Sequence, residues 1–324
     1  MRKRHIGLLL CLFSSTTWAQ LAEHGGLSGE LSVLSGYSKT QSQLNTSTNQ
    51  TISSFNQSAP SDNNSFVAPL GNLKYTFGRG LEKQVYIGTS RADVAVGTLA
   101  AEIGYKEAFQ DGMEIDVSYL PTLLNGEVWQ DPFVTGAKRH KTKVNGNAFR
   151  LKVNKLFGSV FSLDTAYYQR EIRNEHSGED LGLSLDQQRL LGRDSSAIYI
   201  KSSAALQFPT MAFVSPSLIF IDNTADGDAM SFRSYGGELS IFQFLPQQRI
   251  GLTLGYHQRD YASNHPIFDT KRSDEQLKLF LAYEYSMTPY WSIVSLAGYN
   301  ATDSNIEFYD EDNYLVTLGV NFKF

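Results

Sequence analysis

The chain has 324 residues, of which 41% are hydrophobic and 19% are charged, so it is long enough for one large domain and disorder along its whole length is excluded. Its 28 basic and 33 acidic residues give a net charge of −5, which argues against a nucleic-acid partner because such proteins carry a basic surface. The mean hydropathy of −0.27 and the absence of any apolar run of about 18 residues exclude a helical membrane protein but not a membrane barrel, whose strands alternate in polarity.

The first 19 residues are typical of a secretory signal peptide. A basic head at residues 2–4 precedes an apolar stretch at residues 6–13, and small residues form a cleavage site before Gln20. We expect removal of residues 1–19 and a single domain over residues 20–324, with a net charge of −8 from 25 basic and 33 acidic residues. The single cysteine lies in the leader, so disulfides and thiol chemistry are excluded from the mature chain.

From Gly26 onward the hydrophobic pattern changes to a period of two, which places alternate side chains on opposite faces of a strand. Clear examples lie at residues 113–119, 149–154, 250–257 and 276–286. Their length is near the ~9–11 residues that a tilted strand needs to cross a bilayer. A charged side chain at the bilayer midplane costs about 2–4 kcal/mol, so we expect the apolar face to contact lipid and the charged face to line a lumen.

The last eleven residues show this alternation best and end on an aromatic residue. One face carries Tyr314, Val316, Leu318, Val320, Phe322 and Phe324. This ending resembles the C-terminal signal of bacterial outer-membrane barrels, in which the terminal Phe is recognised during assembly. We therefore expect Tyr314, Phe322 and Phe324 to form the assembly signal, with the barrel assembly machinery as a partner.

Connections between the predicted strands fall into two length classes. Short turns are expected at residues 79–82, 109–112, 156–159, 208–210, 245–248 and 287–290, where Gly, Pro or Asp supplies turn geometry. Longer polar connections are expected at residues 39–69, 90–95, 122–146, 171–194, 222–229, 261–272 and 301–311. Together they predict fourteen strands, with short turns in the periplasm and long loops outside the cell, because an even number returns both chain ends to one side. Twelve strands is the alternative, since residues 91–96 are a poor loop, and Pro216 is expected at an edge or bulge.

Charges of both signs occur on the predicted inner faces. The candidates for lining the lumen are Glu114, Asp116, Arg150, Lys152, Asp164, Lys201, His257, Lys278 and Glu284. Rings of such groups filter ions by charge in selective pores. Neighbouring opposite charges are, however, expected to pair along the wall, so strong selectivity for anions or cations is not predicted. Aromatic residues recur at the ends of the apolar faces, as in the girdles that sit at the headgroup level.

The sequence gives little support for catalysis. His257 is the one mature histidine on a well-defined strand, and its neighbours in the sequence supply no serine for a barrel phospholipase or deacylase. Metalloprotease, Walker and Rossmann patterns are missing. Residues 222–228 resemble a calcium loop, but the third position is Thr224 and the twelfth is Arg233 instead of Glu. We predict no enzymatic activity, no catalytic residue, no cofactor and no metal.

Two segments carry a family resemblance. Residues 26–31 with Gly36-Tyr37, and residues 69–77, resemble a family of uncharacterised proteobacterial outer-membrane proteins described only as a domain of unknown function. The resemblance covers essentially the whole mature chain. It implies a location in the outer membrane, with membrane lipid and lipopolysaccharide as surroundings, and no mechanism.

The sequence thus predicts an all-β fold, a transmembrane antiparallel up-and-down barrel of about fourteen strands in the cell outer membrane. Eight-stranded barrels are filled by side chains and those of about sixteen to eighteen strands hold an aqueous channel, so a modest lumen is expected. A passive, porin-like channel for small hydrophilic solutes is the leading hypothesis. The alternative is a binding or structural protein that presents residues 39–69 and 122–146 to a surface, phage or glycan. A lipid-modifying barrel enzyme is the third hypothesis.

Overall fold

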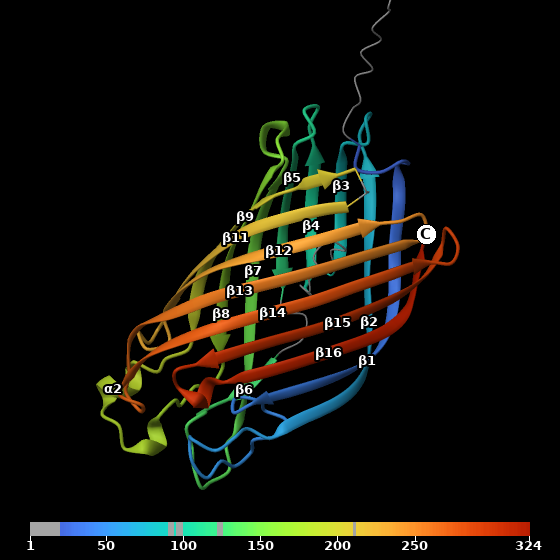
Figure 1. Ribbon diagram of the computed structural model, residues 1–324. Helices are drawn as coiled ribbons and strands as arrows, with labels where there is room; N and C mark the ends of the chain where they lie inside the picture. Colours follow the sequence, from blue (N-terminus) through green and yellow to red (C-terminus); the bar gives the residue numbers. More distant parts are fainter. Residues whose placement is uncertain (1–19, 90–93, 95–99, 122–125, 210–211) are drawn as a thin grey trace, which may run out of the picture.

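Strand pairing closes one antiparallel sheet into a barrel (Figure 1). The computed structural model describes residues 20–89, 94, 100–121, 126–209 and 212–324, and the predicted leader at residues 1–19 lies outside them. The strands are β1 (Gly26–Ser42), β2 (Ser61–Phe77), β3 (Lys83–Thr89), β4 (Ala101–Ala108), β5 (Glu114–Pro121), β6 (Gly126–Trp129), β7 (Lys141–Asn154), β8 (Phe161–Ile172), β9 (Ser195–Ala204), β10 (Leu206–Phe208), β11 (Ala212–Ala225), β12 (Phe232–Phe244), β13 (Gln248–His265), β14 (Thr270–Ser286), β15 (Trp291–Ser304) and β16 (Glu311–Lys323).

Neighbouring strands in the sequence are neighbours in the wall, and β1 pairs with β16 to close it. Both β5 and β6 pair with β7, and both β9 and β10 pair with β11, so each of these couples is one interrupted strand of the wall. Within the described residues the barrel therefore has fourteen strands, which confirms the predicted up-and-down architecture over the twelve-stranded alternative.

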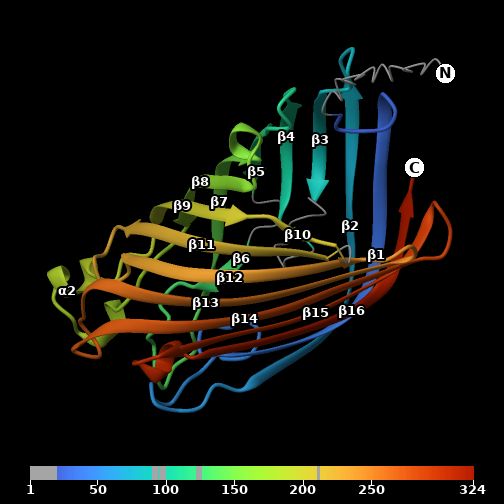
Figure 2. The same cartoon turned by 45° about the horizontal axis from the view of Figure 1, so that its top comes forward.

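The two ends of the barrel differ, as Figures 1 and 2 show. The start of β1, the C-terminus and the short turns lie at one end, and the long connections lie at the other. The described long connections include the short helix α2 (Leu185–Arg189) and the 3-10 turns η2 (Glu179–Leu181) and η3 (Glu307–Tyr309). Among the described residues, no helix has the length and apolar character required to cross a membrane.

Alternation along each strand sorts side chains between the outer surface and the interior. On β16, Val316 and Leu318 are 57% and 61% exposed, whereas Thr317 between them is 3% exposed. On β14, Leu277 and Leu281 are likewise exposed. Exposed apolar side chains recur on strands all around the wall, whereas a soluble monomer rarely exposes contiguous apolar patches larger than a few hundred Å². This outer surface is the lipid face of a transmembrane barrel.

Several strands are longer than the sequence predicts. Residues 261–272 are expected to form a loop, yet β13 continues to His265 and β14 starts at Thr270, so only residues 266–269 connect them. Residues 39–69 and 122–146 also contain strand ends. Outside the lipid both faces of a strand are polar, so the period-two pattern vanishes while backbone pairing continues. Most of the connection expected at residues 90–95 lies outside the described residues, and the described part of the next strand, β4, starts at Ala101.

Pro216 lies beside a break in the wall. The pairing of β11 with β9 stops at Ser217 opposite Ser203 and resumes with β10 at Val214 opposite Leu206. Proline has no backbone N–H to donate to a ladder, which explains an interruption without a change of register at this position. The expected edge or bulge is not found at Pro216: the strand pairs on both sides and keeps its register, and only the ladder toward β9 and β10 is interrupted.

Candidate functional site: the lumen and its lid

A row of alternating charges runs along the inner wall over five neighbouring strands. Lys106 on β4 is the cross-strand neighbour of Asp116 on β5, and Asp116 is in turn the neighbour of Lys152 on β7. Asp164 on β8 and Lys201 on β9 continue the row. Because opposite charges directly across a strand pair attract, the wall itself balances most of its charge.

Two ion pairs in this region show how closely the charges are held. The Nε of Arg150 donates to Oδ1 of Asp164 over 2.8 Å, and a second guanidinium nitrogen of Arg150 donates to Oδ2. The Nζ of Lys106 lies 3.4 Å from Oδ2 of Asp116, and the hydroxyl of Tyr86 donates to Oδ1 of the same carboxylate over 2.5 Å. The forked Arg150–Asp164 geometry is the stronger kind of pair.

Glu238, on β12, binds two lysines at once. Its Oε2 accepts a hydrogen bond from Nζ of Lys201 over 2.5 Å, and its Oε1 accepts one from Nζ of Lys278 over 3.0 Å. The carboxylate is buried at 7% exposure. We call Lys201, Glu238 and Lys278 the lysine trio; two ammonium groups and one carboxylate give it a net charge of +1.

Two cavities lie in the interior of the described barrel, one lined mainly by polar residues and one whose exposed lining is predominantly apolar. The polar cavity has a volume of about 700 Å³ and the apolar cavity about 550 Å³. They share Lys106, Asp116 and Phe242, so they adjoin each other. The predicted residues that line the polar cavity are Asp116, Arg150, Lys152, Asp164, Lys201, His257 and Lys278.

The two remaining candidates lie elsewhere. Glu284 lines the apolar cavity, where its carboxylate accepts from Oγ of Ser292 over 2.8 Å and from Nζ of Lys323 over 2.7 Å. Glu114 begins β5 beside a short turn and belongs to the lining of neither cavity. Among the described residues, no group of His, Cys, Asp and Glu is arranged to hold a metal ion.

An apolar area on the inner wall escapes prediction from the sequence. Leu34 on β1, Phe280 on β14 and Leu296 on β15 are 2%, 5% and 2% exposed and pack together inside the barrel, with Leu70 and Val294 against them. Here both faces of a strand are apolar, as in the run of residues 279–281, so alternation of polarity cannot separate inside from outside. The signal that could have located this area is an apolar residue, such as Phe280, at a position that the period of two assigns to the inner face of its strand.

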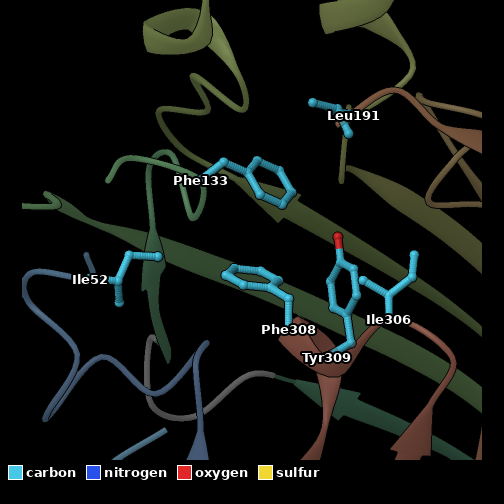
Figure 3. Packing of buried hydrophobic residues seen from close by; sticks show 6 residues of the cluster. All are labelled: Ile52, Phe133, Leu191, Ile306, Phe308 and Tyr309. Atoms are coloured by element: carbon cyan, nitrogen blue, oxygen red, sulfur yellow. The ribbon is translucent and has the colours of Figure 1, made fainter. Parts of the chain in front are cut away.

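The long connections fold together into a lid at the end opposite the chain termini. Its core consists of Ile52, Phe133, Leu191, Ile306, Phe308 and Tyr309, all 6% exposed or less (Figure 3). The ring of Phe308, from the β15–β16 connection, lies 5.5 Å from that of Phe133, from the β6–β7 connection. Since β1 to β4 lie between these two parts of the wall, the contact crosses the mouth of the barrel.

Two buried polar side chains fix the lid. Arg139, 1% exposed, donates from Nε to the carbonyl of Asn49 over 2.8 Å and from a terminal nitrogen to that of Pro132 over 3.0 Å, with its guanidinium 4.4 Å from the ring centre of Trp129. Burial lowers the pKa of Arg139 to about 10, so it stays protonated at neutral pH. It joins the β1–β2 connection to the β6–β7 connection.

His265, fully buried at the outer end of β13, is the second of these groups. Its Nδ1 accepts from the backbone N–H of Ile267 over 3.3 Å, so the neutral ring carries its proton on Nε2 and donates to the hydroxyl of Tyr309 over 2.8 Å. Burial, together with the nearby Arg272 guanidinium, lowers the pKa of His265 to about 3. Neither Arg139 nor His265 has a sequence pattern that distinguishes it from a loop residue.

Comparison with known proteins gives a family but no activity. Residues 26–323 match the model of a family described as "Protein of unknown function (DUF2860)", in keeping with the resemblance predicted from the sequence. No curated protein matches the chain.

Solved structures that resemble the chain are outer-membrane channels of very low sequence identity. The outer membrane channel DcaP of Acinetobacter baumannii has 8% identity and a TM-score of 0.45, with 94% of this chain and 100% of that chain covered. The CymD monoaromatic hydrocarbon channel has 10% identity and a TM-score of 0.46, with 93% and 89% covered. An outer membrane channel from Pseudomonas putida F1 has 10% identity and a TM-score of 0.42, with 94% and 98% covered.

Proposed function

Because the chain belongs to the family Protein of unknown function (DUF2860), whose description assigns no activity, we propose a function from the barrel itself: a passive, porin-like channel for small hydrophilic solutes in the outer membrane. The observation that carries the proposal is the polar cavity of about 700 Å³ inside a wall with an apolar outer surface. A cavity lined by paired charges and hydroxyl groups holds water and small polar solutes.

The lid adds a condition to this function. Loops from opposite sides of the mouth meet in an apolar core, so solutes pass when the lid opens or through openings beside it. We expect discrete, intermittent channel currents in place of the steady current of a wide pore.

Conductance of the purified, folded protein in planar bilayers tests the proposal. Discrete current steps in KCl are expected, and heat-unfolded protein at the same concentration serves as the control. A folded sample, identified by different gel migration before and after heating, that gives no current steps would overturn the channel function.

We also propose the partners that such a location requires, namely outer-membrane lipid, lipopolysaccharide and the barrel assembly machinery. Of the proposed assembly signal, Tyr314 and Phe322 lie on the closing strand β16 and Phe324 directly follows it, with Tyr314 and Phe324 exposed. The backbone of Phe324 exchanges two hydrogen bonds with Gly29, of 2.9 and 3.0 Å. The terminal residue thus contributes to the seam between the first and last strands, which supports a role in assembly.

Surface recognition is the second candidate function, and the packing of the lid favours it. The described parts of the loops at residues 39–69 and 122–146 are held by Arg139 and by the lid core, so they present a fixed outer surface. Loop deletions that abolish binding of a phage or glycan while sparing conductance would assign this function separately.

A further inference from the structure

The inner wall has an apolar side and a charged side, and we propose that the lumen binds water-soluble organic anions with an apolar body, of which medium-chain carboxylates are the simplest. This inference rests on the proposed channel function and names the class of solute that the channel takes. It depends on the apolar cavity, on the lysine trio and on the distance between them.

The apolar cavity offers a surface that a purely hydrophilic solute does not use. Its lining includes Leu34, Leu70, Val294 and Leu296 on one side and Phe242 on β12 on another. Apolar surface in contact with water is unfavourable, and an apolar body of about 550 Å³ or less that covers it gains the hydrophobic free energy of both surfaces. Small-molecule sites have this composition, predominantly apolar with a few placed polar groups.

The carboxylates around the apolar cavity already have partners, so they do not require a cationic ligand. Glu284 accepts from Ser292 and Lys323, and Asp116 accepts from Tyr86 and faces Lys106. An uncharged body therefore fits this cavity without leaving these buried carboxylates unpaired.

The lysine trio supplies a counter-charge for the head group. The three side chains of the trio line the polar cavity and give it a net charge of +1 at this place, and Ser217 and Ser240 add hydroxyl groups. Each ammonium group has three N–H donors and directs one at Glu238. A ligand carboxylate that accepts from the other N–H groups would receive charge-assisted hydrogen bonds, and would bring the charge of the group to zero.

The length of the ligand follows from β12, which contributes to both places. Glu238, Ser240 and Phe242 occupy successive inward positions of this strand, and four residues of strand span about 13 Å. The head group and the end of the apolar body are thus about that far apart, which suits an eight- to ten-carbon carboxylate and not acetate.

Equilibrium dialysis of the protein in lipid nanodiscs, with empty nanodiscs as the partition blank, tests this inference. Octanoate is the probe, acetate lacks the apolar body, and octanol lacks the charge. Octanoate is expected to bind about tenfold more tightly than either. Equal binding of octanoate and acetate, or of octanoate and octanol, would overturn the proposed site.

A charge series at the trio separates recognition from folding. Lys278→Gln leaves Glu238 paired with Lys201 and brings the trio to zero, and Glu238→Gln brings it to +2. Octanoate affinity is expected to fall about tenfold in the first variant and to rise in the second, with octanol unchanged in both. Lys141→Gln, which removes the same charge from an exposed pair with Glu127, is the matched control and should behave as wild type.

Conductance measured on the same preparations distinguishes failure of the site from failure of the channel. Current steps without preferential octanoate binding would overturn the inference and leave the channel function intact. Octanoate binding that follows the charge series, without current steps, would support the site and overturn the channel function. Octanoate affinity that is the same in Lys278→Gln, Glu238→Gln and wild type would also overturn the inference.

Discussion

A single buried side chain, Arg139, holds two loops of the lid together. Arg139→Ala leaves the carbonyls of Asn49 and Pro132 without their donor, and a buried unpaired acceptor costs about 1–3 kcal/mol. We expect the lid to be destabilised by about 2–3 kcal/mol, seen as faster hydrogen exchange in residues 43–60 and 130–140. Arg189→Ala is the matched control, because Arg189 is exposed and pairs with Asp186 one turn away in its own helix, and it should leave exchange unchanged.

His265 makes the lid sensitive to acid. Its pKa is about 3 in the folded lid and about 6.5 when unfolded, so the unfolded lid binds more protons between these values. The stability contributed by neutral His265 is complete above pH 6.5 and decreases as the pH falls toward 3. At pH 5 the lid has lost about 2 kcal/mol of this stability. The physical reason is that a second proton on the imidazole would displace the Ile267 N–H from Nδ1 and would lie near the Arg272 guanidinium.

The measurement is the fraction of time that the channel conducts at pH 7.5 and at pH 5, which should increase on acidification. Burial raises the pKa of Asp131, Asp194 and Asp310 in the loops, and these carboxyls act in the opposite sense, since protonation favours their buried form. The variant His265→Gln keeps a polar side chain that does not titrate. If it responds to pH as wild type does, His265 is not the sensor.

At the scale of strands, β12 and β13 are in contact where the imidazole of His257, on β13, packs on Gly236, on β12. A Cβ at Gly236 would lie 2.1 Å from Nδ1 of His257, so Gly236→Ala must displace the imidazole. We expect a loss of about 1–3 kcal/mol, the range for overpacking in a well-packed interior. Urea unfolding of the folded barrel measures it. The double variant Gly236→Ala, His257→Ala should recover most of the loss; additive losses would show that the two positions are not coupled.

Strands could be predicted from the sequence wherever one face meets lipid and the other meets water. In β16 each inward position is polar or small apart from Leu315, and its outward residues follow from the pattern, which continues one residue beyond the end of the strand at Lys323. The ends of β13 and β14 could not be predicted, because beyond the bilayer no solvent difference separates the faces of a strand. Pro216 was informative since its missing N–H acts locally, whatever surrounds the strand.

At the scale of the whole molecule, the sequence pattern indicates charges on the inner faces of the strands, whereas it contains no sign of the closure of the barrel mouth. The partners of Asp164 and Glu238 have opposite charge because the buried row must balance itself. The lid core, by contrast, joins connections that are distant in the sequence and have no periodicity. The polar composition of residues 39–69 indicates only that they fold against other loops, and Ile52 within them is fully buried in the lid core.

Phe308 is the residue whose substitution tests whether the packed lid limits passage through the barrel. It is 1% exposed, and its ring lies 5.5 Å from Phe133, 5.7 Å from Phe55 and 5.8 Å from Phe268, which belong to three other loops. Phe308→Ala removes these contacts, at about 3–5 kcal/mol for a buried aromatic residue. Because the barrel wall does not depend on this ring, the variant should keep the heat-dependent shift in gel migration of a folded barrel.

In planar bilayers, Phe308→Ala is expected to conduct for a larger fraction of the time than wild type. Leu185→Ala is the control. Leu185 lies in α2, in the β8–β9 connection, at 72% exposure and outside the lid core, so its removal should leave the currents unchanged. If Phe308→Ala gives folded barrels whose current steps match those of wild type in size and duration, the lid is not the barrier, and solutes enter the lumen by a path that bypasses the packed aromatic core.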